Sequence, residues 1–232
     1  GASIFAKEET QALLDEFGHL RDVSSVTLLK MKWMAYWSGA QAKDMAKIAV
    51  LQESITGLTK DQALDQQAKW MKEIRKEGLS SKKVMEDMAS SADFFAMYMK
   101  DGGENMKDAA KEAAKMGLEL SSAESIASSL LDWETSIGKE MEASVLLGRS
   151  LNLDKARQLA YNGDIAEMMK EVKMQAGGEA EFAEMSVVQR QALGEAIGLQ
   201  GANLAEFMKT NADMTAQANQ ETFASIIGWT IL

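Results

Sequence analysis

The amino-acid sequence predicts an all-α fold, and three observations lead to that prediction. The 232-residue chain contains no proline, where average usage would give about a dozen. Because proline removes a backbone donor and clashes with the preceding turn, its absence favours long helical segments. Small polar residues in capping positions precede stretches of helical apolar spacing, and glycines follow them. No alternating apolar pattern of useful length, as a strand would need, is present.

The expected helices are long in the first part of the chain and shorter in the second. Their limits follow from where apolar residues recur every three or four positions and where glycine interrupts that spacing. The longer helices are expected at residues 4–20, 25–55 with a break near Gly39, 60–77, 82–100, 106–116 and 122–147. The shorter ones are expected at residues 153–161, 165–176, 179–185, 187–197 and 204–211.

Capping residues justify the starts and ends of these helices. In a capping box, a small polar residue and a Glu or Gln three positions later satisfy two backbone donors reciprocally. Such boxes are expected at Thr59 with Gln62, Ser121 with Glu124 and Ser186 with Gln189, and related caps at Asp164 and Asn203. The expected ends are marked by Gly57, Gly78, Gly117, Gly148, Gly163 and Gly198.

Apolar residues line one face of several of these helices. A row with steps of three and four residues is typical of a coiled-coil seam. The rows are Leu64, Ala68, Met71 and Ile74; then Met85, Met88, Ala92, Phe95 and Met99; then Ile126, Leu130, Trp133, Ile137, Met141 and Val145.

Helix length predicts three regions. Residues 1–148 are expected to form an extended long-helix region, and residues 149–212 a compact helical module. Residues 213–232 form a tail that ends in an uncharged apolar run, which is either a final buried helix or strand or the start of a longer hydrophobic segment. Because the chain has no cysteine, its stability must come from packing, to which 17 methionines contribute flexible apolar side chains.

The charge balance argues against one class of partner. The formal net charge is −10 at pH 7. Affinity for nucleic acid comes mostly from lysines and arginines that neutralise phosphates, so no sequence-specific nucleic-acid partner is expected. The sequence also lacks a stretch of about twenty apolar residues that could span a membrane.

The residues that build metal sites are scarce. The chain has one histidine, His19, and Glu16 precedes it at the spacing that places two ligands on one face of a di-iron helix. Such a site needs a second copy of the motif, which only a homo-oligomer could supply. The alternative is a surface histidine near a helix C-terminus. We therefore expect neither a metal nor another cofactor.

Catalytic motifs are scarce as well. The sequence has no Gly-x-Ser-x-Gly nucleophile elbow and no phosphate-binding loop. Pairs of carboxylates could support glycoside hydrolysis, as in a cell-wall-cleaving enzyme, but 35 acidic residues make such pairs unspecific. The sequence thus predicts a non-catalytic protein with no catalytic residues.

One aromatic cluster is a candidate interface. Trp33 and Trp37 lie one helical turn apart and share a face, with Tyr36 beside them. The cluster either anchors the core or forms a hot spot for a partner helix, since Trp and Tyr dominate the energetics of interfaces.

Several short segments of the sequence are informative when taken as a set. They read LLGRSLNLDKARQLA at 146–160, NGD at 162–164, EAEF at 179–182 and VQRQAL at 188–193. Together with LRDVSS at 20–25 and VMEDMA at 84–89, this set resembles tail tape measure proteins of large tailed bacteriophages, most clearly over residues 118–210.

The resemblance implies a virion structural protein that templates the assembly and length of the tail tube. The chain would be a C-terminal-side or baseplate-proximal region, packed in the tail lumen or baseplate hub and assembled in the host cytoplasm. Its implied partners are itself, as a symmetric homo-oligomer, and the tail tube and baseplate hub proteins. A host-membrane contact through segments beyond residue 232 is also implied.

Two other functions stay open at this point. A helical adaptor or scaffold could bind partner helices through the face of Trp33 and Trp37. A tail-associated cell-wall lytic enzyme is the minority alternative.

Overall fold

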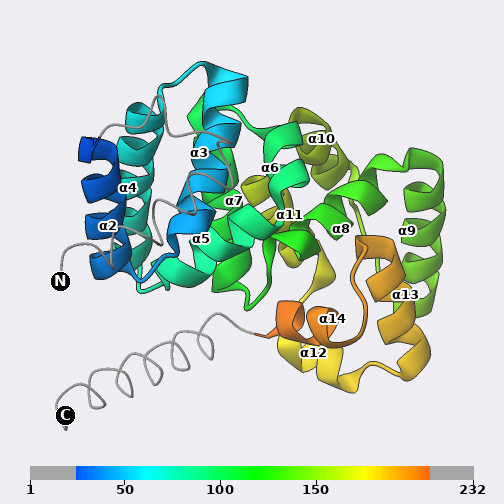
Figure 1. The fold of residues 1–232 in the computed structure, drawn as a ribbon. Coiled ribbons are helices and arrows are strands. Elements are labelled where there is room, and N and C mark those ends of the chain that lie inside the picture. Colours follow the sequence, from blue (N-terminus) through cyan, green and yellow to red (C-terminus); the bar gives the residue numbers. More distant parts are fainter. Residues whose placement is uncertain (1–24, 210–232) are drawn as a thin grey trace, which may run out of the picture. The chain divides into compact units, whose positions relative to one another are not determined.

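The computed structural model describes residues 25–209 of the chain. Over these residues the chain forms thirteen α-helices and one short 3-10 helix, without a strand (Figure 1). The predicted all-α fold is confirmed. The helix expected at residues 4–20 and the tail at residues 213–232 lie outside the described residues.

The helices group into two compact units, and the division between Lys107 and Asp108 falls inside one helix, α7. The sequence predicts a boundary at residue 148 instead. The structure divides the chain earlier because α8 packs against α10 and α11, and α9 packs against α13. The described part of the module expected at 149–212, residues 149–209, therefore shares one core with α8 and α9.

In the first unit, α3 packs against both α4 and α5, and α2 lies against α4 (Figure 1). Its helices are α2 (Ser25–Ser38), α3 (Ala42–Thr56), α4 (Lys60–Lys76), α5 (Ser81–Ser90), α6 (Ala92–Tyr98), the 3-10 turn η1 (Asp101–Gly103) and the start of α7 (Glu104–Lys115). The core is formed by side chains that are fully or almost fully buried: Met45, Ile48, Leu64, Trp70, Met71, Ile74, Met85, Met88 and Phe95.

A glycine allows two aromatic rings to approach the backbone closely in this core. Gly103 has a φ of 98°, and a Cβ atom there would lie 3.0 Å from both the Phe95 and the Trp70 ring. Only a residue without a side chain fits this place without moving a ring.

In the second unit, α10 packs on α11, and α13 runs beside α9 (Figure 1). Its helices after α7 are α8 (Leu120–Leu131), α9 (Trp133–Leu147), α10 (Asp154–Asn162), α11 (Ile165–Ala176), α12 (Glu179–Glu184), α13 (Val187–Ile197) and α14 (Gly201–Met208). Its fully buried side chains include Ile126, Leu130, Leu153, Met168, Met169, Val172, Leu193, Ile197 and Phe207.

Most of the predicted caps are confirmed. The boxes at Thr59 with Gln62 and at Ser186 with Gln189 form in both directions. The predicted glycine ends all have φ between 67° and 79°. The box at Ser121 is wrong, because α8 already begins at Leu120 with Glu119 at the capping position. Asn203 lies inside α14, and Asp164 precedes α11 without a side-chain cap.

Two helices predicted to be continuous are broken. The helix expected at 82–100 divides at Ser91, and the one expected at 122–147 divides at Asp132, whose ψ of 76° is not helical. The break at Asp132 ends the seam that begins with Ile126 and Leu130. By contrast, the break near Gly39 is confirmed.

None of the helices placed by the structure is long and apolar enough to cross a membrane.

Candidate protein-binding site

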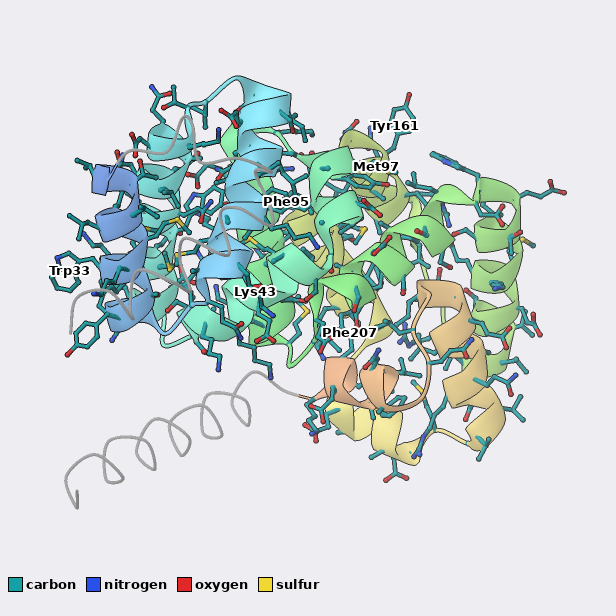
Figure 2. All side chains as sticks on the ribbon, in the orientation of Figure 1. Trp33, Lys43, Phe95, Met97, Tyr161 and Phe207 are labelled. Atoms are coloured by element: carbon teal, nitrogen blue, oxygen red, sulfur yellow. The ribbon has the colours of Figure 1, made fainter. Side chains whose placement is uncertain are left out.

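Helix α2 is apolar on two sides, which is unusual for a helix at a surface. Only two of its fourteen residues are charged. Met31 and Met34 point into the first unit and are buried. The other side of the helix is exposed, with exposed fractions of 63 % for Val26, 66 % for Leu29, 65 % for Trp33 and 87 % for Tyr36. Figure 2 shows Trp33 at the outer side of α2. An apolar stripe normally faces the core, so the outer stripe of α2 needs an explanation of its own.

Specific contacts fix the orientation of α2. Near its start, Thr27 Oγ1 donates to Asp61 Oδ1 of α4 at 2.7 Å. One turn later, Lys30 Nζ lies 2.8 Å from Asp65 Oδ1, also on α4. At its end, Ser81 donates a hydrogen bond of 3.0 Å to the Ser38 carbonyl. These contacts hold the outer stripe away from the core.

The outer stripe borders a shallow groove of about 600 Å³. Its walls come from α2 and from one residue of α4. They carry two lysines and no acidic side chain, and consist of Val26, Leu29, Lys30, Trp33, Met34, Trp37 and Lys72. Since Lys30 is paired with Asp65, the positive charge beside the apolar walls comes from the exposed Lys72, and it suits an apolar partner surface with acidic neighbours.

The structure separates the three aromatic residues predicted from the sequence. Trp33 and Tyr36 are exposed, and their rings meet edge-on with centroids 6.3 Å apart. Trp37 is half-buried, with the Arg75 guanidinium 5.8 Å from its ring centroid. Trp33 and Tyr36 therefore do not anchor the core of the described chain, whereas Trp37 also helps to hold α2 in place.

Sequence reasoning missed two residues of the outer stripe and one residue of the groove beside it. Val26 and Leu29 precede Trp33 by seven and four residues, so the heptad spacing offered a signal for both. Lys72 belongs to α4, and only the packing of α4 on α2 brings it to the groove.

A second exposed apolar row runs along α9 in the other unit. Its members recur every four residues and have exposed fractions of 47 % for Trp133, 43 % for Ile137, 66 % for Met141 and 81 % for Val145. These residues were predicted to continue one seam with Ile126 and Leu130, which is wrong because the helix breaks at Asp132.

A buried arginine holds the inner side of α9. Arg157 of α10 is 1 % exposed, and its Nη1 donates to Ser136 Oγ at 3.0 Å. Its Nη2 donates to Glu140 Oε2 at 2.5 Å and to Asp154 Oδ1 at 2.6 Å. Burial lowers the pKa of Arg157, but the hydrogen bonds and charges of the two carboxylates raise it above its ordinary value. The guanidinium therefore stays charged and fixes which side of α9 faces outward.

A partly buried polar cluster in the first unit is structural. Trp70 Nε1 donates to Glu104 Oε1 at 2.6 Å, and Lys107 Nζ lies 2.9 Å from Glu104 Oε2. Burial raises the pKa of Glu104, but the hydrogen bonds from Lys107, Trp70 and Gln66 lower it below its ordinary value overall. An ionised carboxylate with this many donors is suited to an ion pair and unsuited to act as a general acid.

Metal ligands do not gather within residues 25–209, where no group of three or more His, Asp or Glu side chains is placed to hold an ion. The Glu16 and His19 pair considered from the sequence lies outside the described residues. Comparison of the chain with models of protein families, with curated proteins and with solved structures found no match in any of the three.

Proposed function

We propose that the chain is a non-catalytic assembly protein that binds another protein through the outward face of α2. The observation that carries this proposal is the pair Trp33 and Tyr36, which lie side by side and are 65 % and 87 % exposed. Each large side chain left in water forgoes about 1.5–3 kcal/mol of burial free energy. Aromatic side chains gathered on a fixed helix are the usual anchors of protein interfaces.

The assembly that we propose is a phage tail, because the sequence resembles tape measure proteins. The longest described helix, α4, has 17 residues and spans about 26 Å at 1.5 Å per residue. Residues 25–209 would then serve as a folded docking region at the tail tube or baseplate hub. The net charge of −10 supports this role, since like charge limits adhesion to the DNA that shares the tube.

A photo-crosslinking experiment tests the binding face. Two variants of the chain are produced in cells that assemble the phage particle. One variant carries a photoreactive amino acid in place of Tyr36, and the control variant carries it in place of Tyr161. Tyr161 is also an exposed tyrosine, at 75 %, but lies on α10 (Figure 2). We expect position 36 to form crosslinks to a structural protein of the particle or to a second copy of the chain, and position 161 to form far fewer. Equal yields at the two positions would contradict the proposal.

A second experiment tests the tape-measure role itself. Family members leave the tail ahead of the DNA, so the chain should be present in purified tails and depleted after DNA ejection is triggered. Quantitative mass spectrometry, with the tube protein as the internal standard, measures both amounts. Absence of the chain from intact tails would contradict the tail assignment and leave an adaptor role, which the crosslinking tests separately.

A further inference from the structure

We propose that the outward face of α2 in one copy of the chain binds the outward face of α9 in a second copy. The α2 face comprises Val26, Leu29, Trp33 and Tyr36, and the α9 face comprises Trp133, Ile137, Met141 and Val145. The inference rests on the proposed function, because it names the partner of the same α2 face. It is argued from charge and from the packing of the two helices.

The charges around the two faces are opposite in sign. The exposed Lys72 lines the groove beside α2, and α2 contains no acidic residue, while the second lysine of the groove, Lys30, is paired with Asp65 of α4. Beside the α9 row, Glu134 and Glu142 are both exposed and lie eight residues apart on the same side of the helix. The single basic residue of α9, Lys139, is half-buried on another side. Opposite charges around two apolar surfaces favour their pairing over the pairing of either surface with itself.

The apolar rows are also geometrically compatible. On α2, Val26, Leu29, Trp33 and Tyr36 are spaced by three, four and three residues. On α9 the row advances by four residues at each step. Apolar rows with steps of three and four residues are typical of helices that pack side by side at a crossing angle of about 20°. Each helix could therefore cover most of the other's exposed row.

The contact is heterologous, because the two faces differ. A copy that uses its α2 face keeps its α9 face free, so further copies can add until a ring closes or a linear chain grows. Two single helices bury less area than a standard interface of about 1,600 Å². We therefore expect association to be weak and strongly dependent on concentration.

Sedimentation of the complete 232-residue chain tests the proposal with one variant on each face. Trp33→Glu places a negative charge on the α2 face, and Met141→Lys places a positive charge on the α9 face. We expect the average mass of the wild type to rise with concentration and each variant alone to remain monomeric. In an equimolar mixture the two variants should form a 1:1 complex, since each still carries one intact face.

Matched control variants lie at exposed positions outside both faces. Tyr161→Glu and Met97→Lys introduce the same charges at residues that are 75 % and 76 % exposed (Figure 2). Both controls should associate as the wild type does. Circular dichroism should show unchanged helix content for all four variants, because none of the replaced side chains is buried.

A charge exchange tests the role of the flanking residues. The single variant Lys72→Glu should associate with itself about fivefold more weakly than the wild type does, and added salt should also weaken the self-association of the wild type. Two double variants exchange the flanking charges between the intact faces: Trp33→Glu/Glu142→Lys and Met141→Lys/Lys72→Glu. The affinity in their mixture should lie within about twofold of the affinity in the mixture of Trp33→Glu with Met141→Lys.

Three outcomes would overturn the inference. These are a wild type that stays monomeric up to its solubility limit, a Met141→Lys variant that still forms dimers, or controls that fail to associate. Self-pairing of α2 would explain the second outcome, and a contact elsewhere would explain the third. Crosslinks from position 36 to a different protein, with a monomeric wild type, would refute this inference and leave the proposed function intact.

Discussion

Helices α2 and α4 lie next to each other in the first unit, and each contributes an apolar face to the same core. Their outer faces differ. Helix α4 carries eight charged residues among seventeen, and its outer face is polar. Helix α2 carries two among fourteen, and its outer face is as apolar as its inner one. An outer face in contact with water is usually polar, and this contrast is the basis of our proposal that the outer face of α2 binds protein.

The tryptophans of the two helices show the same difference. Trp70 of α4 is 1 % exposed and donates to Glu104, whereas Trp33 of α2 is 65 % exposed. One residue type therefore stabilises the fold in α4 and is available for binding in α2. The predictions below separate these two roles.

The largest expected effect is on stability at Trp70. Trp70→Ala should lower the free energy of unfolding of the first unit by about 3–5 kcal/mol, because it leaves a cavity and removes a hydrogen bond to Glu104. Trp33→Ala should change it by about 0.5 kcal/mol or less. Urea unfolding followed by circular dichroism measures both. Similar losses for the two variants would remove the distinction between the helices.

The second-largest effect on stability is expected at Arg157, which contacts α9. Arg157→Ala removes the buried partner of Ser136 and Glu140, and should cost about 3 kcal/mol. Gln158→Ala, at the exposed neighbouring position, is the control and should cost less than about 0.5 kcal/mol. The same urea titration applies. A small effect of Arg157→Ala would mean that the orientation of α9 is set by other contacts.

A smaller, pH-dependent effect is expected at Glu104. The pKa of Glu104 is lower in the folded chain than its ordinary value of 4.5. As the pH falls below 4.5, the unfolded chain therefore binds the proton first, and the stability that this carboxylate supplies at neutral pH is lost. The free energy of unfolding of Glu104→Gln should fall less steeply than that of the wild type between pH 5 and 3. Equal slopes would contradict the assigned role of Glu104.

The smallest effect on stability is expected when α2 is made to resemble α4. Leu29→Lys with Tyr36→Glu replaces two exposed apolar residues by charged ones and should change the free energy of unfolding by about 0.5 kcal/mol or less. Solubility should rise, and association through the α2 face should cease. A clear loss of stability would show that this face is covered within the single chain.

The fold was predictable where the signals are local. Proline-free helical spacing, the boxes at Thr59 and Ser186, and the glycine ends act over a few residues, and the structure confirms them. The breaks at Ser91 and Asp132 were not predicted, because neither residue forbids a helix. The helix breaks at these two positions because the flanking segments pack in different directions, and no short window of sequence contains that information.

The candidate site was predictable only in part. The spacing of Trp33, Tyr36 and Trp37 identified the helix and the face they share, but did not determine whether that face is inside or outside. The same limit explains the error at Trp133 and Ile137, whose spacing resembles that of a core. Periodicity locates an apolar face, and the tertiary structure decides what covers it.

Fluorine NMR of the chain labelled with 5-fluorotryptophan tests the central claim most directly. Single Trp→Phe variants assign the resonances of Trp33, Trp70 and Trp133. At low concentration, exchange of water for deuterated water should shift the Trp33 and Trp133 resonances and leave that of Trp70 unchanged. At higher concentration, the resonances of Trp33 and Trp133 should lose this solvent shift as the faces pair. A Trp33 resonance without a solvent shift at every concentration would contradict the account.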